Sequence, residues 1–517
     1  MSDEPGMAEE PSGEEFVKNE VFPEQEELQS STRRPVTARG LAIVGGRAAV
    51  GLAGVGVAAL TIVASVFLQL PVVQSTAPST LITPVATAQQ LVCPGGILRL
   101  ASDSGQDATA AFGLGSATVR SGSSSGSVDS VDAAASDAGT GGTPAAPTII
   151  STPPDATDPS QRILLSGAQS EQVDSGDYVG LAAADCGIAS GDSWLVGGAT
   201  TTGRTTLLTL TNPTEVSATV NLELFGENGA IAAPGTSGII VPASGQRVLS
   251  LAGFAPGLVS PVVHVMSTGG QVQATMQQSV LRGLDPGGID IVESSGSPST
   301  MSVIPGVVVG DETAIAAVRS STSASEVPDD FATVLRLFAP GEEVVPVTVR
   351  VVPESGSGAG ASFSYDLDGG LVTDVPIQEL EPGTYTVIVE SPIPSVASVR
   401  ASSAAGPATD FAWFTSAQKL GALAQFTAAV GPNPVLHVYN PTIAESTVSL
   451  TPLDGPAVSV VVAAGSSVAV ALVAGTSYSL GEFDSVHAAV SLTGNGMLAR
   501  YSVHPPGVGS SPIRIYP

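Results

Sequence analysis

A pattern of short β-strands that recurs along the C-terminal part of the chain constrains its fold most strongly. Residues 206–214 (TLLTLTNPT) recur as residues 435–442 (VLHVYNPT), and a middle copy begins at Leu335. In each copy two stretches of alternating apolar residues flank a turn with proline, which lacks an N–H and suits a turn better than a central strand. Short strands with turn signals every ~8–12 residues are typical of antiparallel β-sandwiches.

The strand after each turn is predicted to be half-buried. Alternation places Val220, Leu222 and Leu224 on one face of this strand, and Asn221 and Glu223 on the other. The sequence therefore predicts a mainly β fold built from tandem immunoglobulin-like β-sandwich domains.

One apolar run, residues 48–70, is predicted to be a transmembrane helix. Its 23 residues carry no charge, and a helix of that length spans ~35 Å, enough for a hydrocarbon core of ~30 Å. Four arginines precede it, whereas the first basic residue after it is Arg99. This asymmetry predicts a cytoplasmic N-terminus and an extracellular C-terminal region in a single-pass cell-membrane protein. The alternative is a cleaved secretion signal ending at residues 86–88, but such signals have a shorter apolar core nearer the cleavage site.

These features give a predicted domain order. It comprises a disordered acidic cytoplasmic tail (1–47), the transmembrane helix (48–70), an extracellular stalk (71–90), a disulfide-bracketed, low-complexity β subdomain (91–192), and three β-sandwiches at 193–300, 301–415 and 416–517. Ser, Gly, Ala, Asp and Thr dominate residues 101–160, so much of that segment is expected to be loose.

The chain is strongly acidic, with a formal net charge of −29. Residues 1–47 hold ten acids and five bases, so residues 48–517 hold 37 acids (47 − 10) and 13 bases (18 − 5), for a net charge of −24. An acidic exterior repels nucleic acid, and we expect no nucleic-acid partner.

The two cysteines, Cys93 and Cys186, both lie on the predicted outer side of the membrane, where disulfides persist. The simplest interpretation is one disulfide between them. Two free thiols, a metal-binding pair or an intermolecular bridge are the alternatives, although the neighbouring sequence offers no histidine or further cysteine as a ligand.

Motifs for catalysis or cofactor binding are weak. Neither lysine follows a glycine, as a phosphate-binding P-loop requires. Residues 122–126 match the hydrolase pattern G-x-S-x-G, but in low-complexity sequence without a flanking strand and helix. The four histidines (His264, His437, His487 and His504) are interpreted as satisfied strand residues, although a triad assembled in space is not visible in sequence. We therefore predict no catalytic, cofactor-binding or metal-binding residues and no cofactor.

Several motifs carry a family resemblance. They are the VCPGG segment at 92–96, Asp185-Cys186, SWLVGGA at 193–199, LTNP at 210–213 and VHV at 263–265. Together with one N-terminal span, these motifs resemble actinobacterial single-pass membrane proteins grouped only as a domain of unknown function. The resemblance covers most of the predicted outer region and is strongest over 186–280. It implies a cell-envelope protein, and it carries over no catalytic residues.

The expected function is a non-catalytic, membrane-anchored envelope scaffold or binding protein that displays tandem β-sandwiches outside the cell. Its partner would be an envelope protein or glycan. One alternative is a transmembrane signalling or regulatory protein that uses its acidic tail. Another is a cell-wall glycan hydrolase, which needs paired carboxylates in one cleft.

Overall fold

Strands account for most of the described structure in a computed structural model of the chain, so the mainly β prediction is confirmed. The structure describes residues 80–82, 88–100, 110–137, 145–154, 163–321, 330–354, 358–378, 380–507 and 513–515. All of these residues belong to one unit, Ser79–Ile515.

The predicted acidic tail (1–47) and transmembrane helix (48–70) lie outside the described residues. Within the described ranges, no helix is long and apolar enough to cross a membrane. Inside the predicted stalk, Thr80–Ile82 forms β1, which pairs antiparallel with β35 (Ile513–Ile515).

The first group of strands includes the segment that composition predicts to be loose. Its sheets have the orders β2-β8-β6, β10-β9-β5 and β3-β4. The strands are β2 (Gln89–Cys93), β3 (Leu98–Leu100), β4 (Ala111–Gly113), β5 (Thr118–Ser123), β6 (Asp129–Asp132), β8 (Thr148–Thr152), β9 (Leu165–Ser175) and β10 (Tyr178–Asp185). Much of the described part of 110–137 and 145–152 is strand, because β9 and β8 supply hydrogen-bond partners for β5 and β6.

The second group consists of two five-stranded sheets with the orders β11-β17-β13-β14, to which β15 pairs, and β19-β18-β12-β16-β7. The strands are β7 (Ala134–Ala135), β11 (Asp192–Val196), β12 (Arg204–Asn212), β13 (Ala218–Gly226), β14 (Gly229–Ile231), β15 (Ile239–Val241), β16 (Gly245–Ser250), β17 (Val262–Gly269), β18 (Gln273–Arg282) and β19 (Asp285–Glu293). Leu208 of β12 and Val220 of β13 share one hydrophobic cluster, so the core lies between the sheets. On β13, Val220, Leu222 and Leu224 are buried and Glu223 is exposed, which confirms the predicted alternation.

The third group is a seven-stranded arrangement that shares one long strand, β25. Its first half pairs with β20 and β22, and its second half pairs with β21 and β26. The elements are β20 (Ser299–Val309), α2 (Glu312–Ser321), β21 (Val334–Phe338), β22 (Val345–Pro353), β23 (Ala361–Leu367), β24 (Thr373–Pro376), β25 (Gly383–Ala405) and β26 (Ala408–Thr415).

The fourth group consists of two four-stranded sheets with the orders β27-β32-β29-β30 and β31-β28-β33-β34. The strands are β27 (Leu423–Thr427), β28 (Val435–Tyr439), β29 (Ser446–Pro452), β30 (Val458–Val462), β31 (Ser467–Ala471), β32 (Ser477–Gly481), β33 (His487–Gly494) and β34 (Met497–Ser502). Leu436 of β28 and Val448 of β29 belong to one buried cluster between them.

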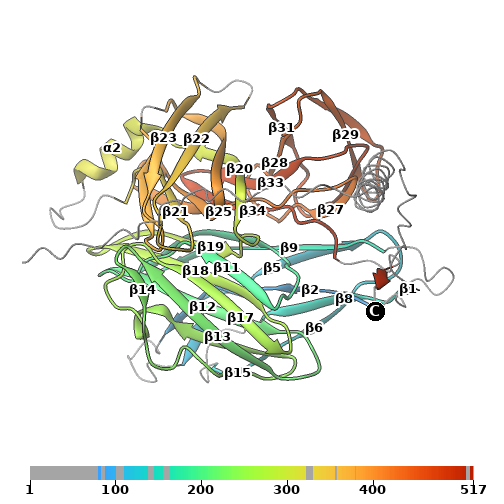
Figure 1. Cartoon of the computed structure of the whole chain (residues 1–517), viewed down its shortest axis with the longest axis horizontal. Helices are drawn as coiled ribbons and strands as arrows, with labels where there is room; N and C mark the ends of the chain where they lie inside the picture. The colour runs from blue at the N-terminus through green and yellow to red at the C-terminus, as the bar shows by residue number, and fades with distance from the viewer. Residues whose placement is uncertain are drawn as a thin grey trace, which may run out of the picture. The chain divides into compact units, whose positions relative to one another are not determined.

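Each of the four groups ends in a hairpin, and the last strands of the four hairpins form a closed ring. The hairpins are β9–β10, β18–β19, β25–β26 and β33–β34. Their last strands contact one another in the order β10, β19, β26, β34 and back to β10. Figure 1 shows β19 and β34 in the middle of the described unit, with the second group below them and the third and fourth above. The groups therefore meet through these strands.

The recurring Asn-Pro-Thr turn has the same hydrogen bonds in the second and fourth groups. Asn212 Nδ2 donates to the carbonyls of Val216 and Val241, and Asn440 Nδ2 donates to those of Ala444 and Val462. In both turns the Asn Oδ1 accepts from the N–H and the hydroxyl of the Thr two residues later, at 2.7–3.0 Å. The asparagine side chain thus donates hydrogen bonds in a turn where the following proline has no N–H to donate.

Substituting this asparagine should destabilise the fold. Asn440 is fully buried, and Asn440→Ala removes its side-chain hydrogen bonds, leaving main-chain groups unpaired at a cost of about 3 kcal/mol. Urea denaturation measures the loss in free energy of unfolding. The matched control, Glu445→Ala, changes an exposed residue of the same loop and should shift stability by less than about 0.5 kcal/mol. Equal stability of the two variants would contradict this role.

Candidate functional site

The disulfide anchors one end of the ring. Cys93 at the end of β2 and Cys186, directly after β10, are bonded at 2.03 Å, as the sequence predicts. Both are fully buried beside Ile150. The bond fixes the end of β10, where Asp185 lies.

Asp410 of β26 is the centre of the ring. Its Oδ1 accepts the N–H groups of Ile289 and Phe411, and its Oδ2 accepts those of Leu181 and Leu498, at 2.9–3.1 Å. One carboxylate therefore bonds to main-chain groups from all four strands of the ring. Burial raises the pKa of Asp410, whereas its four N–H donors stabilise the ionised form and lower the pKa.

A second acidic junction lies at the other end of β19. Glu293 Oε1 accepts the N–H of Asp185 at 2.5 Å, and its Oε2 accepts the N–H of Ser502 at 3.0 Å. Burial raises the pKa of Glu293 to about 7, while these two donors and the nearby Arg500 lower it. Both oxygens of Glu293 are thus engaged in holding β10 and β34 together.

A cavity of about 460 Å³ lies beside this junction. Its walls come from the end of β10, the start of β11, β18, the end of β19 and the segment after β34. The residues that give it its chemical character are Asp185, Ser190, Gln273, Glu293, Ser295 and His504. The volume falls within the ~300–1,000 Å³ of small-molecule sites.

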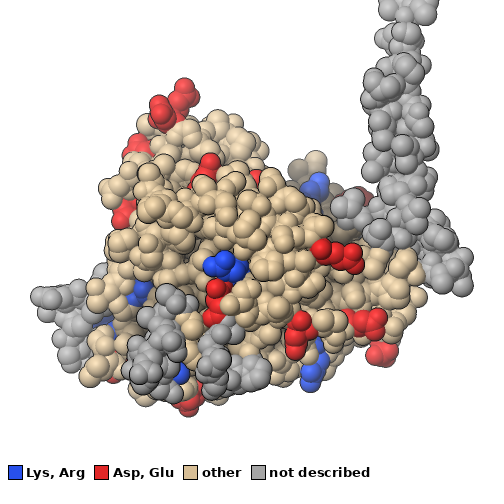
Figure 2. All heavy atoms as spheres, turned by 90° about the horizontal axis from the view of Figure 1, so that it is seen from below, with Lys and Arg blue, Asp and Glu red and all other residues tan. Residues whose placement is uncertain are grey.

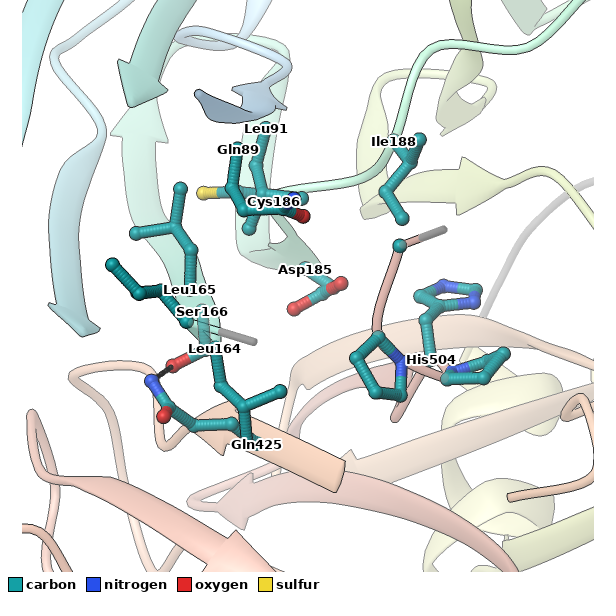
Figure 3. A pocket seen from close by; sticks show the side chains of 14 residues that line it. Gln89, Leu91, Leu164, Leu165, Ser166, Asp185, Cys186, Ile188, Gln425 and His504 are labelled. Carbon is teal, nitrogen blue, oxygen red and sulfur yellow. Dashed lines mark hydrogen bonds between the residues drawn. The ribbon is translucent and has the colours of Figure 1, made fainter. Parts of the chain in front are cut away.

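Residues 504–507 separate this cavity from a second, smaller hollow and line both. Figure 3 shows the second hollow, with the Asp185 carboxylate between Leu165 and Ser166 on one side and His504 on the other. On its far wall Gln425 Nε2 donates to Ser166 Oγ at 3.1 Å. Asp185 is therefore the acid that both hollows share.

Burial sets the protonation of the two facing groups. The pKa of Asp185 is raised well above its usual range by burial and then by the negative charge of Glu293. The pKa of His504 is lowered to about 4, first by burial and then by Arg500. His504 is consequently neutral near pH 7 and does not supply a positive charge to Asp185.

A separate trio has the connectivity of a hydrolase triad. His437 Nδ1 lies 3.0 Å from both carboxylate oxygens of Glu354, and its Nε2 lies 2.8 Å from Ser491 Oγ. All three residues are at most 3% exposed, and none of them lines either cavity above. A nucleophile must reach its substrate, so this trio is a buried connection between the third and fourth groups.

His264 and His487 lie on strands and have polar contacts, but His487 Nε2 is buried without a hydrogen-bond partner among the described residues. His504 lies after β34 and lines the cavity. His264 lies 2.8 Å from Asp192 and 2.9 Å from Glu223, and His487 Nδ1 lies 2.9 Å from the carbonyl oxygen of Ala417. In the 122–126 segment, Ser124 Oγ accepts the N–H of Leu164 within a turn. Among the described residues, no group of three or more metal-ligating side chains comes together.

Sequence reasoning missed the acids that organise the ring and the cavity. Asp290 of β19 accepts the N–H of Trp413 in β26 at 2.7 Å. Asp290 and Asp410 each occur within an apolar strand, in GIDIV and TDFAW, and Asp185 ends AAAD. An aspartate within an apolar strand is rarely buried unless its carboxyl group is paired. The position of these acids in apolar strands was therefore the one sign in the sequence that they have buried partners. Apart from Phe411, the residues that donate to Asp410 lie more than 80 positions away, so the sequence does not identify them.

The described part of the chain defines a class of mainly β protein, in which four strand groups meet at a ring and a polar cavity lies beside one junction of that ring. The chain belongs to a family of unknown function, DUF5719, whose model matches residues 134–473, more than half of the chain. The resemblance to a family of unknown function is thereby confirmed. No curated protein and no solved structure matches the chain. Actinobacterial origin and single-pass membrane status stay predictions.

Replacing Asp410 by asparagine should destabilise the whole unit. An amide has one acceptor oxygen, so its NH₂ group would face two of the four buried N–H donors. Two unpaired N–H groups predict a loss of about 4 kcal/mol in the free energy of unfolding. Urea denaturation of Asp410→Asn measures it, with Asp366→Asn, an exposed change, as the control. A loss no larger than the control's would show that Asp410 does not hold the ring.

Glu293 should make stability depend on pH. Its pKa of about 7 in the folded chain lies above its ordinary value of 4.5, so between these values the folded chain keeps a proton that the unfolded chain releases. Stability from this group therefore falls as pH rises, by about 2 kcal/mol between pH 5 and pH 7. Unfolding of the wild type and Glu293→Gln at both pH values measures this contribution together with the effect of Glu293 on Asp185, because groups that do not interact with Glu293 cancel in the difference. Parallel pH dependences would contradict the assignment.

Proposed function

We propose that this chain is a non-catalytic, membrane-anchored binding protein of the cell envelope, and that the cavity beside Asp185 holds a glycan. In this proposal residues 48–70 form the anchor and the β-rich region lies outside the cell. The observation that carries it is a polar cavity whose walls come from the first, second and fourth strand groups, which are joined at one ring. Such preorganised walls lower the entropic cost of binding.

The lining residues suit a hydroxyl-rich ligand. Serine hydroxyls, glutamine amides and carboxyl groups converge on the cavity, and they form hydrogen bonds with several hydroxyl groups at once. Lys and Arg stand apart from one another on the face in Figure 2, rather than gathering in a basic patch. That distribution supports a partner other than nucleic acid.

Binding is favoured over hydrolysis because both carboxylate oxygens of Glu293 already accept main-chain hydrogen bonds. A glycoside hydrolase needs two carboxyl groups that are free to act on the substrate. Asp185 and Glu293 do line one cavity, but both Glu293 oxygens accept main-chain N–H groups. The signalling alternative depends on residues 1–47, outside the described ranges, and stays a prediction. Immunoglobulin-like β-sandwiches remain our proposal for the paired sheets.

Filling the cavity should abolish glycan binding. We expect the full-length protein in detergent to sediment with cell-wall polysaccharide, and Ala189→Trp, in the cavity wall, to weaken binding at least tenfold. The matched control, Val216→Trp, places the same side chain at a position 56% exposed and away from the cavity, and should bind like wild type. Equal binding by both variants, or no binding by wild type, would overturn the proposal.

A further inference from the structure

The lining of the cavity is rich in carboxyl groups and other hydrogen-bond acceptors. Asp185, Asp192 and Glu293 all line it, whereas no lysine or arginine is among its lining residues, which all belong to the described part of the chain. Arg500, in the ring strand β34, acts on Glu293. Asp192 has its own partner, since one of its oxygens lies 2.8 Å from His264 Nε2. Glu293 Oε2 lies 4.0 Å from His504 Nε2, so Asp185 is the lining acid that has no basic side chain within 4.0 Å among the described residues.

The other groups that act on Asp185 do not neutralise it. Glu293 of β19 adds negative charge, Tyr501 of β34 is neutral because burial raises its pKa well above its usual range, and His504 is uncharged near pH 7. Asp185 is only 8% exposed, so its interactions are weakly screened by water. A positive charge on a ligand would therefore be stabilised strongly beside it.

A second observation indicates a ligand rich in donors. Gln273 lines the cavity and is 93% buried, and its side-chain oxygen has no hydrogen-bond partner within the described structure. A buried acceptor without a partner destabilises the chain, and a donor on the ligand would remove that cost. An ammonium group is donor-only, with three N–H groups and a charge.

We propose that the ligand is an amino sugar whose free primary ammonium pairs with Asp185 and whose hydroxyl groups bond to the serine and glutamine side chains of the same cavity. This inference rests on the proposed glycan-binding function. It excludes uronic acids and phosphorylated sugars, because their negative charge would lie next to Asp185 and Glu293. It also excludes N-acetylated sugars as equal ligands, because acetylation removes the charge.

Binding should be linked to the release of a proton. Burial keeps a proton on Asp185, and an incoming ammonium takes the place of that proton, so the affinity for the amine increases with pH until the amine itself deprotonates. A side chain with a purely structural role would not produce this linkage.

Calorimetric titration of the full-length protein in detergent tests the inference with four named probes: glucosamine, N-acetylglucosamine, glucuronate and Nα-acetyl-lysine amide. We expect saturable binding of glucosamine, at least tenfold tighter than N-acetylglucosamine, with no binding of glucuronate. Heats measured in two buffers of different ionisation enthalpy should reveal proton release. Asp185→Asn should weaken glucosamine binding at least tenfold and abolish proton release, and Asp366→Asn, an exposed change, should do neither.

The other outcomes separate this inference from the proposed function. Equal binding of N-acetylglucosamine and glucosamine, or retained affinity in Asp185→Asn, overturns the ammonium pairing and leaves glycan binding intact. Equal binding of Nα-acetyl-lysine amide overturns the amino sugar in favour of a peptide amine. If the protein sediments with polysaccharide but does not bind glucosamine, this inference alone is overturned. If it does neither, the proposed function is overturned as well.

Discussion

The structure depends on main-chain N–H groups of the ring strands that bond to buried carboxylates instead of to another strand. Asp410 accepts four such groups from β10, β19, β26 and β34. Where strands from four groups meet without sharing one sheet, their buried N–H groups need other acceptors, because unpaired ones are costly. A carboxylate offers about four acceptor sites and therefore serves four strands at once. Glycine is needed beside it, since a Cβ at Gly288 (φ +115°) would lie 2.6 Å from Asp410 Oδ1.

The same principle explains where the cavity lies. Glu293 joins β10 to β34 through two N–H groups, and the disulfide holds the end of β10 from the other side. Between these two constraints, the Asp185 side chain has an orientation set by fixed main chain on both sides. The cavity therefore lies at the junction of β10, β19 and β34 and does not belong to any single strand group. Its geometry depends on how these strands are held together.

Much of the fold was predictable because it follows from local patterns. The alternation of Val220, Leu222 and Leu224 predicted a half-buried strand, and the repeated Asn-Pro-Thr turn marked equivalent positions in two groups. Composition was a poorer guide to residues 101–160, since β5 and β6 form there through pairing with β9 and β8. The candidate site was not predicted, because Asp185, Gln273 and His504 come together only through contacts between distant segments.

The sequence by itself determined the strand periodicity, the turn chemistry, the family and the pair of cysteines that bond. It did so because these depend on neighbours a few positions apart or on a single possible pairing. Only the tertiary structure decided that four hairpins close a ring and that the acids in apolar strands are acceptors for its N–H groups. It also decided that Asp185 borders a cavity whose described lining residues include no lysine or arginine. Those properties depend on burial and on distances between segments, and burial changes the chemistry of a carboxyl group that is unremarkable in the sequence.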